Sequence, residues 1–236
     1  MLRRYEKQYS HALGREMEFL VFGHAGAPVL VFPTSKGRFY QWEDFRMIEA
    51  LRHHLERGWL QLFCVDSVDH LSWYNFEDHQ RTCLDWHLAY EQYLLSEFLP
   101  RLRQLNSTPF LILSGASFGA FHAVNFALRY PHVADRVVAM SGDYSSGKYV
   151  EGYYDADVLA NSPLDYLSSM SPQQLDPATR GVEFRLASGR WDFCQQPTKE
   201  LAFHLGRLGV PVQSHMWDDP GIHDWPLWRH QVLSYL

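Results

Sequence analysis

The sequence lacks long hydrophobic runs and concentrated charge of either sign. No stretch approaches the 18 apolar residues that a membrane-spanning helix needs, and the longest basic run is the pair Arg3-Arg4. The formal net charge is −6, with 20% charged residues. Because nucleic acids and anionic membranes bind clustered Lys and Arg, these absences argue against both partners and favour a small neutral or apolar molecule.

Cysteine is also scarce. Cys64, Cys83 and Cys194 are an odd number of cysteines and lack the spacing of metal ligands, so a disulfide framework is not expected. Reduced thiols are typical of cytosolic proteins. The basic start in residues 1–19 is not followed by an apolar run of signal-peptide length. The sequence therefore predicts a cytoplasmic protein that is not exported.

Short β-rich runs alternate with helical patterns along the whole chain. With 46% hydrophobic residues, this alternation predicts one α/β domain spanning residues 1–236, with a mostly parallel central sheet and helices on both faces. The expected strands are 17–23, 28–34, 60–66, 109–115, 136–142, 183–189 and 210–217. The expected helices are 42–57, 79–99, 119–129 and 197–208. The first two strands, separated by "HAGA", are expected to form an antiparallel hairpin.

Residues 143–182 interrupt this alternation. The segment is rich in Tyr, Ser, Asp and Pro, and it is too long for an ordinary connection between a strand and a helix. Two interpretations are open: a small cap inserted beside an active site, or a decorated surface loop.

The stretch "SGASFGAFHA" (114–123) contains a candidate nucleophile. Its pattern Gly115-x-Ser117-x-Gly119 follows an apolar strand pattern and precedes a helical pattern that stops before Pro131. Strand, G-x-S-x-G and helix make up the nucleophile elbow, a tight turn that exposes a serine hydroxyl at the positive end of a helix. The alternative is a glycine-lined turn with an inert serine. The flanking patterns favour Ser117 as a nucleophile.

A serine hydroxyl needs a base, and the chain offers 13 histidines. His223 lies in a loop with Gly and Pro after the last expected strand, which is where α/β-hydrolases carry the base. His122 follows the elbow within a helix, His215 lies inside a strand, and His53 and His54 belong to an amphipathic helix, where packed or solvated histidines are common. Location therefore favours His223.

The base needs a carboxylate partner, and chain order places it between the serine and the histidine. Asp192 directly follows the penultimate expected strand and is the first choice. The rivals are Asp143, after the strand before it, and the pair Asp218 and Asp219. Asp224 adjoins the histidine and would have difficulty reaching its ring. Most loop aspartates form turns or cap helices, which is the alternative for each of them.

An acyl-transfer site also needs N–H donors for the oxygen that becomes negative. In this arrangement one donor is the backbone N–H after the nucleophile, which belongs to Phe118. The other comes from the loop after strand 28–34, where Ser35 or Lys36 would supply it. This chemistry requires no metal and no organic cofactor.

These residues resemble the esterase family of α/β-hydrolases that contains S-formylglutathione hydrolases, feruloyl-type esterases and mycolyltransferases. The resemblance covers most of the chain, through "GRFYQWEDF", "GASFGAFHAVNFALRYP", "SGDY", "SGRWDF" and above all "GIHDWPLWRHQV", which is similar to the family signature Gly-x-His-x-Trp-x-x-Trp. It implies a triad of Ser117, Asp192 and His223, with Ser35 as the second oxyanion donor. One departure is Pro33-Thr34, which replaces the usual His-Gly or Asp-Gly before that donor.

The expected function is that of a serine hydrolase that cleaves small-molecule carboxylic esters through an acyl-enzyme. One alternative is transfer of the acyl group to an alcohol, and another is a non-catalytic binding protein on a degenerate hydrolase fold. The acyl chain, the alcohol and the oligomeric state stay open. Aromatic residues proposed for an acceptor pocket are Trp73, Tyr149, Tyr153, Tyr154, Tyr166 and Trp191.

Overall fold

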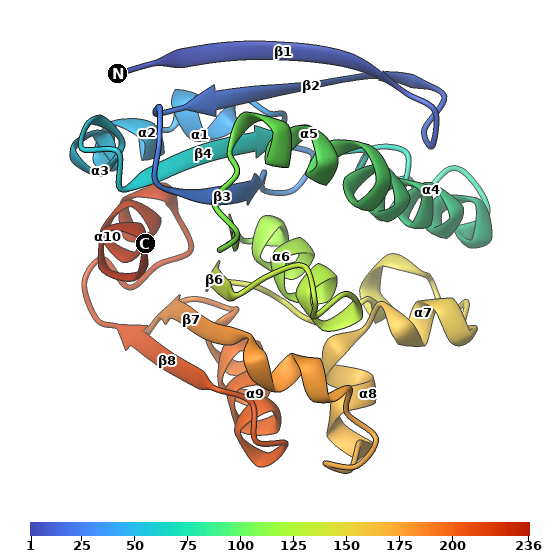
Figure 1. The fold of residues 1–236 in the computed structure, drawn as a ribbon. Coiled ribbons are helices and arrows are strands. Elements are labelled where there is room, and N and C mark those ends of the chain that lie inside the picture. Colours follow the sequence, from blue (N-terminus) through green and yellow to red (C-terminus); the bar gives the residue numbers. More distant parts are fainter.

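The chain forms an eight-stranded sheet in a computed structural model that describes residues 1–236 (Figure 1). The strands are β1 (Arg3–Ser10), β2 (Arg15–Phe22), β3 (Ala27–Phe32), β4 (Leu60–Val65), β5 (Ile112–Ala116), β6 (Arg136–Met140), β7 (Glu183–Gly189) and β8 (Val212–Trp217). Their order across the sheet is β1-β2-β4-β3-β5-β6-β7-β8. Strands β3 to β8 are parallel, and β1 and β2 add an antiparallel edge. The expected, mostly parallel sheet is confirmed.

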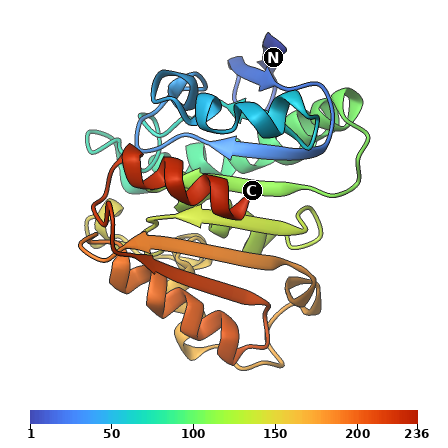
Figure 2. The same cartoon turned by 90° about the vertical axis from the view of Figure 1, so that its left-hand side faces the viewer.

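Helices cover both faces of the sheet (Figure 2). They are α1 (Gln41–Asp44), α2 (Met47–Ala50), α3 (Arg52–Glu56), α4 (Gln80–Tyr93), α5 (Leu99–Leu105), α6 (Phe118–Arg129), α7 (Ala156–Ala160), α8 (Pro163–Ser169), α9 (Gln195–Arg207) and α10 (Trp225–Tyr235). Helices α1 to α3 and α10 pack on one face, and α4 to α6, α8 and α9 pack on the other. None of these helices has the length and apolar character required to cross a lipid bilayer.

Strand β3 is apolar at every position because helices cover both of its faces. Val29 and Val31 point to the face covered by α10, whereas Leu30 and Phe32 point to the face covered by α6. Alternate side chains of a strand point to opposite faces, so a strand covered on both sides is apolar at every position. The α/β-hydrolase fold follows from several such strands with a helix between each pair.

The hairpin expected from the first two predicted strands does not form. Strand β4 lies between β2 and β3, and β2 instead pairs with β1, which the sequence analysis did not identify. All six residues of β4 are buried, and insertion between two apolar strands satisfies its backbone on both edges. Strand β1 is mostly exposed and rich in charge, as suits an edge strand, and therefore lacks the apolar alternation that reveals a strand.

The helix expected at 42–57 is broken into α1, α2 and α3. Arg46 has a left-handed backbone (φ 62°) between α1 and α2, and Leu51 separates α2 from α3. The apolar spacing correctly predicts that Trp42, Ile48, Leu51 and Leu55 are buried, but Phe45 on the same predicted face is 43% exposed, and the backbone hydrogen bonds are not continuous. By contrast, the helix expected at 79–99 continues past its predicted end, because a π-helical turn (Leu94–Phe98) joins α4 to α5.

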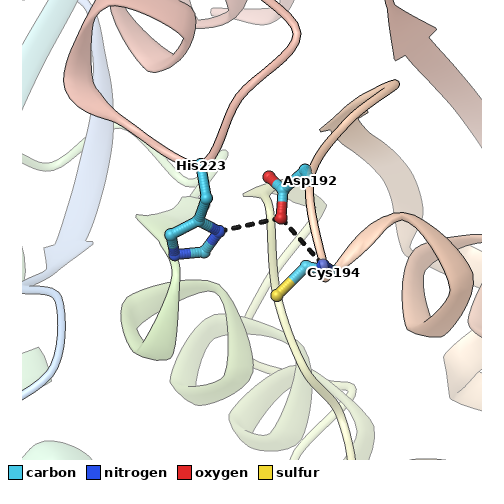
Figure 3. A group of neighbouring side chains, drawn as sticks. All are labelled: Asp192, Cys194 and His223. Atoms are coloured by element: carbon cyan, nitrogen blue, oxygen red, sulfur yellow. Dashed lines mark hydrogen bonds and ion pairs between the residues drawn. The ribbon is translucent and has the colours of Figure 1, made fainter.

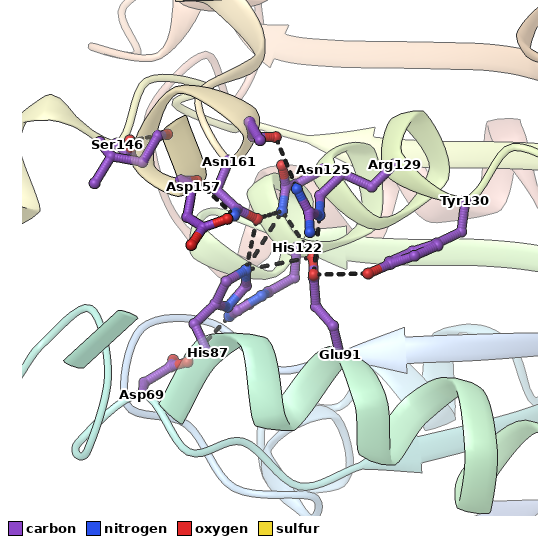
Figure 4. A network of polar contacts seen from close by, with 12 residues as sticks. Asp69, His87, Glu91, His122, Asn125, Arg129, Tyr130, Ser146, Asp157 and Asn161 are labelled. Atoms are coloured by element: carbon purple, nitrogen blue, oxygen red, sulfur yellow. Dashed lines mark hydrogen bonds and ion pairs between the residues drawn. The ribbon is translucent and has the colours of Figure 1, made fainter. Parts of the chain in front are cut away.

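Segment 143–182 docks on the helical layer through buried polar contacts (Figure 4). It contains α7, α8 and two short 3₁₀ helices, Gly147–Tyr149 and Pro177–Gly181. Asn161, which follows α7, bonds to His87 of α4 at 3.0 Å and to Asn125 of α6 at 2.8 Å. All three side chains are buried, so the segment is fastened to the core as a cap.

Candidate active site

Ser117 occupies the sharp turn between β5 and α6. Its backbone lies at φ 54° and ψ −121°, a conformation that non-glycine residues rarely adopt. A Cβ at Gly115 would overlap the backbone of Gly119, and a Cβ at Gly119 would overlap the carbonyl oxygens of Phe32 and Pro33. The two glycines are therefore required for the turn to form, and the turn places the serine hydroxyl at the N-terminus of α6.

The structure brings Ser117, His223 and Asp192 together. His223 Nε2 lies 2.9 Å from Ser117 Oγ, and His223 Nδ1 lies 2.9 Å from Asp192 Oδ1. Asp192 follows β7 and His223 follows β8, so the ends of parallel strands position both residues. The amide of Cys194 also donates to Asp192 Oδ1 at 2.7 Å (Figure 3). These contacts orient the imidazole with one nitrogen toward the carboxylate and the other toward the hydroxyl.

Asp192 is held as a carboxylate. Burial by itself favours the neutral acid, but hydrogen bonds from His223 and from the Cys194 amide outweigh it, and the pKa of Asp192 falls below its usual value. The ionised form is an acceptor only, so it fixes a proton on the facing ring nitrogen of His223. The other ring nitrogen is then free to accept the proton of a hydroxyl group.

The carboxylates of Asp143, Asp218 and Asp224 have other partners, and Asp219 makes no hydrogen bond with His223. Asp143 pairs with Lys148 at 2.6 Å, and Asp218 pairs with Arg190 at 2.9 Å. Asp224 caps α10 through its own side chain, as loop aspartates often do. None of these contacts involves His223.

Two backbone N–H groups beside Ser117 have no acceptor within the protein. They belong to Phe118, the first residue of α6, and to Ser35, in the loop after β3. The amide of Lys36, the alternative to Ser35, donates to Asp69 Oδ2 at 3.0 Å. Ser35, Ser117 and Phe118 line the same cavity. Of the two loop residues considered, only Ser35 therefore has a free amide at the cavity.

Asp69 was missed by the sequence analysis. Its Oδ2 accepts from the Lys36 amide, and its Oδ1 lies 3.0 Å from His122 Nε2 on α6. The side chains of Asp69 and His122 are 1% and 3% exposed. Lys36 has a positive φ of 56°, so this buried pair stabilises an unusual turn. The only signal in the sequence is an acidic residue four positions after a buried strand, which many surface loops share.

The cavity at Ser117 has a volume of about 120 Å³. Its lining residues are Ser35, Tyr74, Ser117, Phe118, Asp143, Lys148, Tyr149, Phe193 and Cys194. The hydroxyl of Tyr74 lies 2.6 Å from Ser35 Oγ and 3.3 Å from that of Tyr149. Because Asp143, Lys148 and Tyr149 belong to segment 143–182, the start of the cap forms part of the cavity wall.

The aromatic residues considered for an acceptor pocket are dispersed. Tyr149 lines the cavity, and Trp73 is buried behind it. Tyr166 lines a separate hollow between α6, α7 and α8. Tyr154 and Trp191 are 60% and 73% exposed. These side chains therefore do not share one pocket.

Asp192, Cys194 and His223 could also be read as metal ligands, because one potential ligand atom of each lies within 4.8 Å of the others (Figure 3). A cysteine binds metal as a thiolate, whereas burial raises the pKa of Cys194 and keeps its thiol protonated. His223 Nδ1 already faces the carboxylate. The group fits an acid–base pair better than a metal centre.

The chain is similar to known esterases in sequence family and in fold. The model of the Esterase family, described as "Putative esterase", matches residues 10–235. A ferulic acid esterase is similar in structure, with a TM-score of 0.79 and 18% identity over 99% of this chain and 95% of that chain. An S-formylglutathione hydrolase from Agrobacterium tumefaciens has a TM-score of 0.73 and 16% identity over 99% and 93%. One from Staphylococcus aureus has a TM-score of 0.64 and 18% identity over 98% and 95%. A search of curated protein sequences finds no match.

Proposed function

The chain belongs to the Esterase family, and from this premise we propose that it hydrolyses small-molecule carboxylic esters through an acyl-enzyme on Ser117. The observation that carries the proposal is the hydrogen-bonded chain from Ser117 through His223 to Asp192, beside two amides with no acceptor in the protein. A nucleophile, a base, an orienting acid and oxyanion donors are the parts that acyl transfer needs. Ser117, Ser35 and Phe118 line one cavity, and His223 and Asp192 connect to it through the hydroxyl of Ser117.

In the first half-reaction His223 Nε2 takes the proton of Ser117 while Oγ attacks the ester carbonyl. The carbonyl oxygen becomes negative, and the amides of Phe118 and Ser35 donate to it. Asp192 stabilises the imidazolium that forms. His223 then gives its proton to the leaving alcohol as the bond between the carbonyl carbon and that oxygen breaks, which leaves the acyl group on Ser117.

The second half-reaction uses water in place of the alcohol. His223 takes a proton from water, the resulting hydroxide attacks the acyl carbonyl, and the same amides hold the oxyanion. The proton returns to Oγ of Ser117 as the carboxylic acid leaves.

We further propose that residues 1–236 act as a single domain, because strands from both ends of the chain belong to one sheet.

The test compares wild-type protein with Ser117→Ala and with Ser169→Ala, which changes an exposed serine on α8. The measurements are hydrolysis of p-nitrophenyl esters from acetate to palmitate and covalent labelling by a fluorophosphonate. Ser117→Ala is expected to lower kcat by about 10⁴- to 10⁶-fold and to abolish labelling, whereas Ser169→Ala does neither. Turnover or labelling that survives Ser117→Ala would contradict the proposal.

A further inference from the structure

Three large apolar side chains stand exposed beside the proposed triad. Trp191 and Phe193 flank Asp192 in the chain and are 73% and 72% exposed, and Ile222 precedes His223 and is 52% exposed. We call Trp191, Phe193 and Ile222 the apolar rim. Single exposed apolar residues are common, but exposed apolar side chains concentrated at a reaction site are typical of a binding surface.

The loops that carry the apolar rim are joined at their base. The amide of Trp191 donates to the carbonyl of Gly221 at 2.7 Å, and Arg190 bonds to the β8 end through its amide at 2.8 Å. A Cβ at Gly189 would overlap the backbone of Gly221, so the two loops touch directly. The backbone beneath the rim is therefore fixed, and the exposed side chains project from a preformed surface.

The position of Phe193 indicates which half of the ester the apolar rim would contact. Its ring centroid lies 4.2 Å from that of His223, and Phe193 also lines the cavity at Ser117. In the proposed mechanism His223 protonates the oxygen of the leaving alcohol, so that oxygen must come within hydrogen-bond reach of Nε2. The substituent on that oxygen then leaves the cavity next to Phe193.

Other residues that line the cavity are buried. Phe118, Tyr149 and Cys194 are only 3%, 7% and 2% exposed, and the whole cavity measures about 120 Å³. These buried residues suit the acyl group, which stays covalently bound during the reaction. The exposed rim suits the alcohol, which departs after the first half-reaction.

We propose that the apolar rim binds the alcohol part of the substrate, and that this alcohol is uncharged and carries an aromatic or other bulky apolar group. The inference depends on the acyl-enzyme mechanism proposed above, because that mechanism identifies which half of the ester meets His223. Two cations near the site are paired: Arg190, which lies over the ring of Trp191, pairs with Asp218, and Lys148, which lines the cavity, pairs with Asp143. Contact with one aromatic face buries enough apolar surface to change affinity about tenfold.

The test uses two acetate esters, benzyl acetate and methyl acetate, whose leaving alcohols have similar acidity but differ in apolar size. The quantity is the ratio of kcat/KM for benzyl acetate to kcat/KM for methyl acetate. We expect Trp191→Ala and Phe193→Ala each to lower this ratio about tenfold, mainly through KM. The matched control is Phe203→Ala, which removes a phenylalanine of similar exposure (67%) from α9 and should leave the ratio unchanged.

A ratio that stays within about twofold of wild type in both rim variants would overturn the proposal. Calorimetry measures the binding of benzyl acetate to Ser117→Ala, which needs no turnover. It therefore distinguishes failure of the rim proposal from failure of the acyl-enzyme mechanism. The acyl-enzyme proposal fails if wild-type protein hydrolyses no ester and a fluorophosphonate does not label Ser117. The rim proposal requires that adding Trp191→Ala to Ser117→Ala weakens the binding of benzyl acetate, and unchanged binding overturns it.

Discussion

Removal of the Asp69 carboxylate should lower turnover much more than it affects substrate affinity. Asp69 touches no part of the proposed reaction directly, but it binds the Lys36 amide and His122 on α6. Lys36 follows Ser35, whose amide is a proposed oxyanion donor, and α6 begins at Phe118, which supplies the other. Asp69 is therefore a positioning residue that links the two segments carrying these donors.

The size of the effect follows from these contacts. Asp69→Ala removes a buried hydrogen bond to His122 and a part-buried one to the Lys36 amide. The first loss costs about 1–3 kcal/mol and the second about 0.5–1.5 kcal/mol, so we expect a loss of about 2–4 kcal/mol in the free energy of unfolding. If the loop then moves and the Ser35 amide is lost as a donor, kcat should fall by about 10²- to 10³-fold with little change in KM.

Asp69→Asn provides the conservative comparison. Its amide oxygen can accept from Lys36 while its NH₂ group donates to His122, provided that the ring adopts its other tautomer. We therefore expect Asp69→Asn to retain most of the activity that Asp69→Ala loses.

The assay measures kcat and KM for p-nitrophenyl acetate together with the urea midpoint of unfolding. Leu205→Ala, which leaves a cavity beneath α9, should reduce the free energy of unfolding by a similar amount, about 2–5 kcal/mol, without changing kcat. The reasoning would be refuted if folded Asp69→Ala had a kcat within about threefold of Leu205→Ala.

Three further predictions concern the triad and the cysteines. Asp192→Asn should lower kcat by about 10⁴-fold in ester hydrolysis while the protein still melts cooperatively, because an amide cannot hold the required tautomer of His223. Since the pKa of Asp192 is lowered on folding, its ionised form stabilises the protein above the usual carboxylate pKa, and this stability is lost as the pH falls through the folded-state value. Urea midpoints measured from pH 6 to pH 3 should therefore fall less steeply for Asp192→Asn than for wild type. Burial raises the pKa of Cys64, Cys83 and Cys194, so iodoacetamide at pH 8 should label them in urea but not in native protein.

The sequence was most informative where one short motif determines both the local fold and the place of a candidate catalytic residue in it. The G-x-S-x-G turn between an apolar strand and a helix correctly located β5, Ser117 and α6, and strand order placed Asp192 and His223 at neighbouring strand ends. Side chains that meet across the fold leave no such pattern. Asp69 and His122 are 53 residues apart in the chain, and nothing local to either residue indicates their contact.

Contacts between distant parts of the chain also explain where the predicted fold was wrong. Strand β1 is recognisable only by its partner, because its own residues are polar and exposed, and the insertion of β4 beside β2 is decided by pairing across the sheet. The family resemblance favours Ser35 over Lys36 as the second donor, and the folded loop adds the physical reason, because the amide of Lys36 is already bonded to Asp69.

The backbone of Ser117 has a consequence for how this protein tolerates mutation. Its conformation suits glycine, so Ser117→Gly should relieve strain, whereas Gly115 and Gly119 cannot gain a single carbon atom without displacing main chain. A survey of variants scored by cellular abundance would mark the two glycines as intolerant, and would find that glycine is well tolerated in place of the serine between them. A survey scored by ester hydrolysis would find all three intolerant. The difference in tolerance at position 117 between the two surveys would measure the stability that the protein gives up by having serine there for catalysis rather than glycine.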